Sequence, residues 1–121
     1  FIAADPRQID AANRIGAEVI ALHTGAYCDA IAEGDVETRD REYQALREMA
    51  AYGASLGLEV HAGHGLTFDS VGPIAAFPEV KELNIGHFLI GESIFLGLSD
   101  AIVEMRRLMD EARGAPLRTA G

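Results

Sequence analysis

The chain has 121 residues, of which 49% are hydrophobic and 24% are charged, and its formal net charge is −9. This length allows one small domain with a hydrophobic core. The acidic balance argues against a nucleic-acid surface or an anionic membrane as partner, and no apolar run approaches the roughly 20 residues of a membrane span. Because the single cysteine, Cys28, cannot form an internal disulfide, we expect a reducing, cytoplasmic compartment.

Apolar runs and helix signals alternate along the chain. Asp5 is a good N-cap for a helix that starts at Pro6, because proline is favoured at the first helical position. Gly57 is expected to end a long central helix. In chain order we predict a strand over 1–4, a helix from 6 to about 15, a strand over 18–22, a loop over 26–35 with room for a helical turn, and a helix from 36 to about 56. A strand from 58, a short helix from 69 or 70 to about 77, a strand over 83–85 and a helix from 88 to about 95 follow, and Ser99 is expected to cap a last helix that runs to about 113.

The spacing of apolar residues predicts which helix faces are buried. The first helix is expected to bury Ile9, Ala12 and Ile15, and the last helix Ile102, Met105, Leu108, Met109 and Ala112. Residues 114–121 are expected to fray, as chain ends commonly do.

The predicted order is strand then helix, repeated four times. Strands that are apolar throughout favour a parallel sheet, with helices outside it. Four such units form either a small open sheet or half of an eight-stranded barrel. The chain begins at Phe1, directly in an apolar run. We therefore expect an α/β fold with 1–121 as one domain, strands 5–8 of a TIM (β/α)8 barrel and a segment of a longer chain.

The four histidines share one position in this pattern. His23, His61, His64 and His87 each lie at or just after the C-terminal end of a predicted strand. Ligands bind at that edge of the sheet in parallel α/β proteins. The sequence therefore predicts a functional site at this edge.

The histidines differ in the chemistry that their neighbours suggest. His64, between Gly63 and Gly65, is the best acid–base candidate; the alternative is a tight turn in which it only hydrogen-bonds the backbone. His61 belongs to the strand, so packing or hydrogen bonding is favoured for it. His23 with Thr24 is expected either to hold substrate or to link neighbouring loops.

Gly86 and His87 precede a short predicted helix. Barrels bind phosphate between the loops after strands 7 and 8 and the N-terminus of a short extra helix, and the alternative is an ordinary glycine turn. The spacing of His61 and His64 is only a weak metal signal, so we expect no metal. A catalytic role for the Cys28 thiol is disfavoured, because no base is evident near it.

Three stretches resemble the pyridoxine 5′-phosphate synthase family: Leu22-His23-Thr24-Gly25, residues 57–67 with Ala-Gly-His-Gly-Leu-Thr, and residues 82–87, Glu-Leu-Asn-Ile-Gly-His. Residues 97–114 continue the resemblance, which covers nearly the whole chain and corresponds to the C-terminal half of the family's barrel.

The resemblance implies that 3-amino-2-oxopropyl phosphate and 1-deoxy-D-xylulose 5-phosphate condense to pyridoxine 5′-phosphate, without a cofactor or a metal. It implies that the histidine at 64 is the proton donor, and that Gly65, Gly86 and His87 bind the aminooxopropyl phosphate. It also implies a homo-oligomer.

The sequence departs from the family pattern at two points. A His and a Glu that complete the family's acid–base set lie on earlier strands, absent from this chain. The family usually carries a Glu that assists the transition state two residues before His23, where this chain has Ala21. A non-catalytic half-barrel and a metal-dependent hydrolase therefore stay open as alternatives to the synthase.

Overall fold

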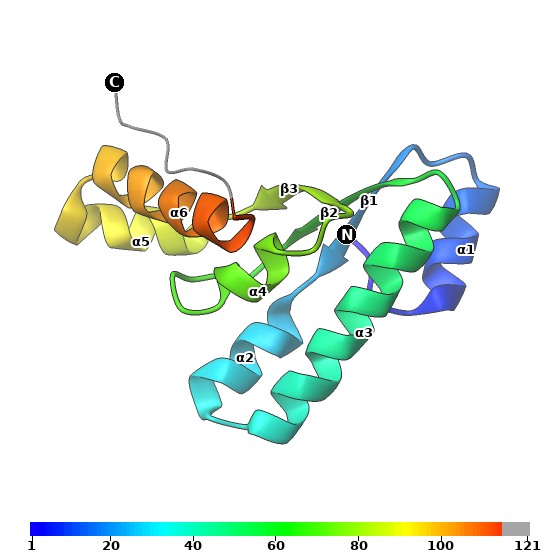
Figure 1. Ribbon diagram of the computed structural model, residues 1–121, viewed down its shortest axis with the longest axis horizontal. Coiled ribbons are helices and arrows are strands. Elements are labelled where there is room, and N and C mark those ends of the chain that lie inside the picture. Colours follow the sequence, from blue (N-terminus) through cyan, green and yellow to red (C-terminus); the bar gives the residue numbers. More distant parts are fainter. Residues whose placement is uncertain (115–121) are drawn as a thin grey trace.

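A three-stranded parallel sheet forms the centre of the computed structural model, which describes residues 1–114. Its strands are β1 (Val19–His23), β2 (Glu59–Gly63) and β3 (Val80–Asn84), and β2 lies between the other two (Figure 1). The last residues of the three strands are aligned, because His23 pairs with Gly63 and Gly63 with Asn84. The α/β class with parallel strands is as predicted, although β3 begins earlier than expected.

Six helices are described within residues 1–114. They are α1 (Pro6–Arg14), α2 (Gly25–Glu33), α3 (Val36–Ser55), α4 (Val71–Ala75), α5 (His87–Leu96) and α6 (Leu98–Ala112). α2 packs on α3, α3 packs on the sheet, and α6 packs on both α4 and α5 (Figure 1). Each strand is thus followed by helical structure, as in successive βα units.

The predicted first strand is wrong in extent. Only Ile2 pairs with β1: its N–H donates to Ala21 O at 2.9 Å, and its carbonyl accepts from His23 N–H at 2.9 Å. The backbone then turns away, because the N–H of Asp5 donates to Ala3 O at 2.8 Å. The described chain therefore has three strands and one bridge in place of four strands.

The prediction of a loop over 26–35 is also wrong, because α2 occupies most of it. Gly34 ends this helix in the left-handed region, at φ +72°, and the Asp35 side chain accepts from Thr38 N–H at the start of α3. Gly34 thus ends one helix and Asp35 caps the next. Glycine and aspartate are also common in loops, so in sequence the pair also indicates a loop. This helix buries Tyr27 and Cys28 beneath the end of β2.

The hydrophobic core lies between the sheet and the helices. Its largest fully buried apolar side chains are Ile9, Leu22, Leu66, Ile74, Val60 and Val71. Two predicted core residues are exposed. Ile15 (84% exposed) follows the end of α1, and Ile102 (49% exposed) lies beside Ala101, which faces inward with Met105. Ser99 does not cap α6, which begins at Leu98 after Gly97.

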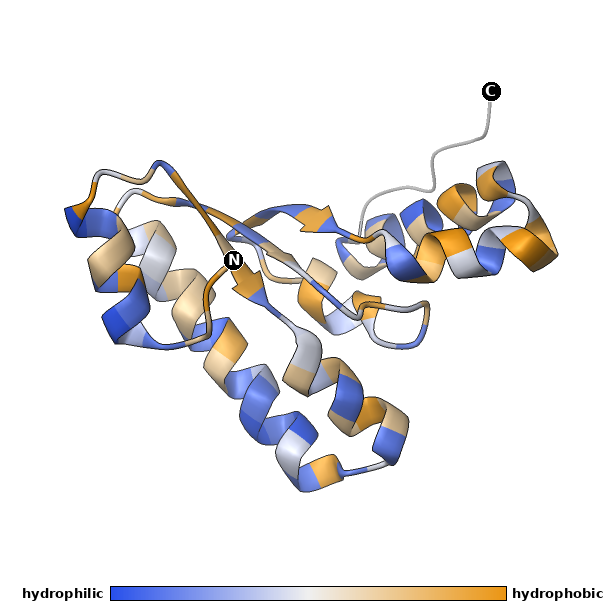
Figure 2. Cartoon of the chain, turned by 180° about the vertical axis from the view of Figure 1, so that it is seen from behind, coloured by the Kyte–Doolittle hydropathy of each residue, from blue (hydrophilic) through white to orange (hydrophobic). Residues whose placement is uncertain are grey.

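The two ends of the molecule differ in hydropathy. Hydrophobic residues lie along α5 and α6, at the end of the molecule away from α1 (Figure 2). Among them, Ile90, Ile94 and Phe95 are exposed. None of the helices described in residues 1–114 is long and apolar enough to cross a membrane. The expected fraying of 114–121 concerns residues that, apart from Gly114, lie outside the described range.

Candidate functional site

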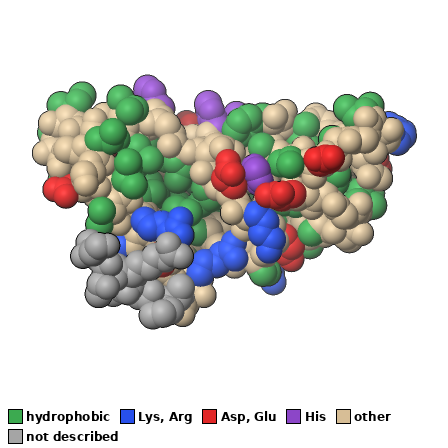
Figure 3. All heavy atoms as spheres, turned by 90° about the horizontal axis from the view of Figure 1, so that it is seen from above, with side chains coloured by type: hydrophobic (Ala, Val, Ile, Leu, Met, Phe, Trp, Pro, Cys, Tyr) green, Lys and Arg blue, Asp and Glu red, His purple; other side chains and the backbone are tan. Residues whose placement is uncertain are grey.

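Three of the four histidines lie at the C-terminal edge of the sheet. His23 is the last residue of β1, His64 follows β2, and His87 is the first residue of α5, just beyond β3. All three are exposed. In Figure 3, several histidine side chains, in purple, lie along one edge of the view, and another, set in from that edge, lies between acidic side chains, in red. The structure therefore brings these three predicted site residues to one rim.

The rings of His23 and His64 stack on each other. Their centroids are 4.3 Å apart and their planes make an angle of 25°. The N–H of Gly25 donates to Nδ1 of His23 at 3.2 Å. Because Nδ1 accepts this hydrogen bond, the neutral His23 ring carries its proton on Nε2. The stacking of the two rings brings the end of β1 into contact with the loop after β2.

The backbone at His64 has an unusual conformation. Its φ is +86°, and it is the one non-glycine residue with positive φ in the described chain; Gly65 follows at +81°. A side chain in this region is unfavourable for most residues. Two consecutive left-handed residues turn the chain sharply at the end of β2 and leave the His64 ring at the surface.

Thr24 holds this turn from the neighbouring strand. Its hydroxyl is fully buried and donates to the carbonyl of His64 at 2.7 Å. Its N–H donates to Gly63 O at 2.8 Å. Gly63 also has no room for a side chain, because a Cβ there would lie 2.6 Å from Asn84 O. The chain leaving β2 is therefore fixed between β1 and β3.

Buried groups from α2 support the loop from below. The Tyr27 hydroxyl donates to Ser70 O at 3.2 Å, and Cys28 Sγ lies 3.7 Å from His64 O. Burial raises the pKa of the Cys28 thiol and raises the pKa of Tyr27 to about 12. Both groups are therefore protonated near neutral pH, and a thiol in this state is a poor nucleophile. Sequence reasoning missed them as supports because it placed them in a loop; Gly34 was the available helix-stop signal.

The loop after β2 and the start of α5 lie side by side. The ring of Phe68 meets the ring of Phe88 edge to face, with centroids 4.8 Å apart. Gly86 occupies the N-cap of α5 without a side-chain cap, and His87 follows it. The first backbone N–H groups of a helix have no partner within it, so they are available to an anion together with the His87 side chain.

His61 lies inside β2, away from the turn that carries His64. Its Nε2–H donates to Glu59 Oε1 at 2.9 Å, and its Nδ1 is 3.8 Å from Glu82 Oε1. This confirms the prediction that His61 hydrogen-bonds within the sheet. No group of three or more His, Cys, Asp or Glu side chains suited to a metal ion occurs among the described residues.

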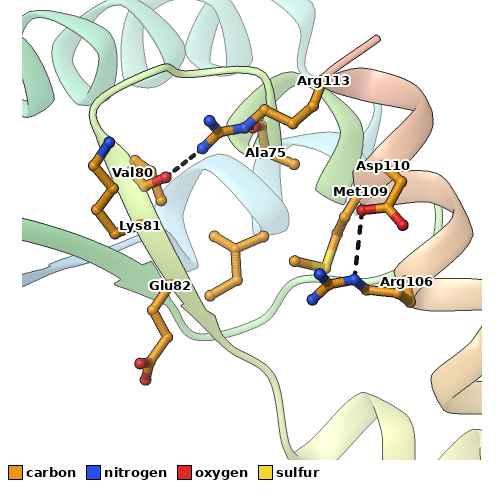
Figure 4. Close-up of a pocket in the computed structure, with 9 residues that line it drawn as sticks. Ala75, Val80, Lys81, Glu82, Arg106, Met109, Asp110 and Arg113 are labelled. Carbon is orange, nitrogen blue, oxygen red and sulfur yellow. Dashed lines mark hydrogen bonds and ion pairs between the residues drawn. The ribbon is translucent and has the colours of Figure 1, made fainter. Parts of the chain in front are cut away.

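A separate pocket of about 450 Å³ lies between β3 and the C-terminal part of α6 (Figure 4). The guanidinium of Arg113 crosses it and donates to the main-chain oxygens of Ala75 and Val80. Arg106 pairs with Asp110 at 3.4 Å. Val80 is the first residue of β3, whereas the histidine rim follows its last residue. The pocket therefore lies along β3 and α6, and none of the three rim histidines lines it.

A parallel sheet with helices between its strands, and with its polar groups at the C-terminal strand ends, defines an α/β protein of the βα-barrel type. Residues 1–111 match the family described as "Pyridoxal phosphate biosynthesis protein PdxJ". The chain belongs to this family.

Relatives of known name agree with this assignment. The chain is 78% identical to the pyridoxine 5′-phosphate synthase of Ruegeria pomeroyi, over 93% of this chain and 46% of the relative. It is 75% identical to the enzyme of that name from Roseobacter denitrificans (93% of this chain, 45% of the relative) and 67% identical to that from Jannaschia sp. (93% and 46%). The chain thus spans about half the length of the curated relatives it matches, in agreement with a half-barrel.

Proposed function

We propose that the full-length protein containing this chain is a pyridoxine 5′-phosphate synthase. It condenses 3-amino-2-oxopropyl phosphate with 1-deoxy-D-xylulose 5-phosphate to pyridoxine 5′-phosphate, with release of phosphate and water. The observation that carries this proposal is the placement of His64: a left-handed turn at the end of β2 presents its ring at the rim, and the start of α5 lies beside the same loop.

His64 acts as the proton donor. The condensation of an amine with a ketone expels water, and the departing oxygen needs a proton. An imidazole is suited to supplying one near neutral pH. The exposed ring of His64 is open to a substrate above the rim, and its stacking on His23 limits the directions in which it can turn.

The aminooxopropyl phosphate binds at the start of α5, through Gly86 and His87, and at Gly65. Free backbone N–H groups and the positive end of the helix dipole favour a phosphate there. The net charge of −9 does not oppose this, because the attraction is local. His23 and Thr24 support the site from the adjacent strand.

In the full-length protein, residues 1–121 supply strands 5–8 of the barrel as one domain, and the segment around Ile2, which pairs with β1, is the first of these strands. The remaining acid–base groups, and contacts to the sugar phosphate, come from the rest of the protein. The assembly is a cytoplasmic homo-oligomer that needs no cofactor for this chemistry.

The test is turnover by the purified full-length protein. With both phosphorylated substrates, we expect pyridoxine 5′-phosphate and inorganic phosphate to form in equal amounts. The same assay on residues 1–121 alone is expected to give no product. A full-length protein that is folded and makes no product would support the non-catalytic alternative and contradict the proposal.

A further inference from the structure

We infer that Thr24 is a positioning residue for His64, acting through the carbonyl of His64 rather than on substrate. The inference rests on the proposed role of His64 as proton donor. Thr24 lies 40 residues before His64 in the chain and on a different βα unit, yet its hydroxyl donates to His64 O at 2.7 Å. This contact joins β1 to the turn that carries the proposed proton donor.

The environment of Thr24 makes this hydrogen bond specific. The residue is fully buried, so its hydroxyl has no bulk water as an alternative partner. Its own N–H donates to Gly63 O at 2.8 Å. Thr24 therefore binds two consecutive carbonyls of the chain leaving β2, at Gly63 and His64. Removal of the hydroxyl would leave the second of these carbonyls without its short buried donor.

The conformation of His64 explains why such a donor matters. A non-glycine residue at φ +86° persists only where the surroundings favour that conformation over the ordinary one. The carbonyl of His64 belongs to the peptide unit that joins it to Gly65, which is also left-handed. A donor fixed on this oxygen keeps the unit from rotating, and it thereby stabilises the left-handed backbone conformation from which the His64 side chain projects.

The residues on either side of Thr24 also orient the His64 ring. His23, which directly precedes Thr24, stacks on the His64 imidazole at 4.3 Å, and the N–H of Gly25 fixes the His23 ring through Nδ1 at 3.2 Å. Thr24 thus holds the backbone of His64, and His23, itself fixed by Gly25, covers one face of the His64 ring. Among these contacts, the hydrogen bond from the Thr24 hydroxyl can be removed by a conservative substitution.

The test compares Thr24→Val with Thr24→Ser in the full-length protein. Valine keeps the shape of threonine and lacks the hydroxyl, whereas serine keeps the hydroxyl. Because a displacement of about 1 Å at a catalytic group can cost about 100-fold in rate, we expect the valine variant to lose about 10- to 100-fold in kcat. KM for 1-deoxy-D-xylulose 5-phosphate should change less than about threefold, because its proposed contacts come from the rest of the protein. KM for the aminooxopropyl phosphate is not a control here, because the Gly65 N–H belongs to the same peptide unit as the His64 carbonyl. The serine variant should recover most of the lost kcat.

Thr38→Val is the matched control. The Thr38 hydroxyl donates to Asp35 Oδ2, also at 2.7 Å, at the start of α3. Its removal should lower thermal stability and leave kcat unchanged. A loss of kcat in Thr24→Val and not in Thr38→Val would show that the effect comes from the hydrogen bond to His64, and not from the loss of any threonine hydroxyl.

His64→Asn separates the inference from the proposed function. If His64→Asn is inactive and Thr24→Val keeps full kcat, the positioning role is overturned while the proton-donor role stands. If His64→Asn keeps normal kcat, the proton-donor role itself fails. If Thr24→Val and Thr24→Ala both fail to fold while Thr24→Ser folds, the hydroxyl serves the fold as a whole and the positioning role is likewise overturned.

Discussion

Ala21 of β1 lies opposite His61 of β2 in the parallel register, and His61 in turn lies opposite Glu82 of β3. The β1 member of this row, Ala21, has only a methyl group at the position for which the sequence resemblance implies a glutamate. The imidazole of His61 contacts Glu59 Oε1 at 2.9 Å and Glu82 Oε1 at 3.8 Å. Carboxylates are thus present beside His61 on β2 and β3, but none is supplied by β1.

Ala21→Glu in the full-length protein is expected to raise kcat by at least about tenfold. A carboxylate that stabilises charge developing in the transition state contributes on the order of 100-fold or more, and this position supplies none now. Steady-state turnover measures the change. Val19→Glu adds the same charge two residues earlier on β1 and should not raise kcat. Equal rates for the wild type and Ala21→Glu would mean that another group already fills the role.

His87→Ala is expected to weaken binding of 3-amino-2-oxopropyl phosphate. A hydrogen bond to a charged group contributes about 1.5–3 kcal/mol, so KM for this substrate should rise by roughly 10- to 100-fold. KM for 1-deoxy-D-xylulose 5-phosphate serves as the internal control and should change much less. An unchanged KM for the aminooxopropyl phosphate would remove His87 from the phosphate site.

Leu22→Ala tests the core beneath the rim. Leu22 is 1% exposed and packs in the cluster between the sheet and the helices. Truncation of a buried leucine costs about 2–5 kcal/mol, because a cavity remains. Ile15, at 84% exposed, is the matched surface site, where Ile15→Ala should change the free energy of unfolding by less than about 0.5 kcal/mol. Urea unfolding of both variants measures the difference.

The cap of α3 makes stability depend on pH. The hydrogen bonds from the Thr38 hydroxyl and the Thr38 N–H lower the pKa of Asp35 below its usual 3.8. Since the folded pKa lies below the unfolded one, this stabilisation is present above pH 3.8 and is lost as pH falls below it. Asp35→Ala should therefore lower Tm at neutral pH, and its Tm should approach that of the wild type in acid. A difference that stays constant from neutral pH to pH 2 would contradict this linkage.

Local signals in the sequence predicted much of the fold. The Asp5-Pro6 pair starts α1, with the Asp5 side chain accepting from Arg7 N–H as expected for an N-cap. Gly57, at φ +83°, lies just past the end of α3. These assignments succeeded because a cap or a left-handed residue depends on its immediate neighbours. These helix boundaries, together with strands that are apolar throughout, were enough to predict parallel βα units.

Contacts between distant segments could not be read in the same way. The hydrogen bond from Thr24 to His64 and the stacking of His23 on His64 depend on how β1 and β2 are aligned. A periodicity of apolar residues predicts that both strands exist, and it does not set their register. The sequence therefore placed the histidines at one edge, whereas the pairing of two of them required coordinates.

The most direct test of the central claim is turnover by the full-length protein with His64→Asn. Asparagine is polar and of similar size but cannot donate a proton in acid–base catalysis, and such catalysis contributes about 100- to 10,000-fold. We predict a loss of kcat in that range with an unchanged circular dichroism spectrum. A folded His64→Asn protein that forms pyridoxine 5′-phosphate at a rate within twofold of the wild type would contradict the account.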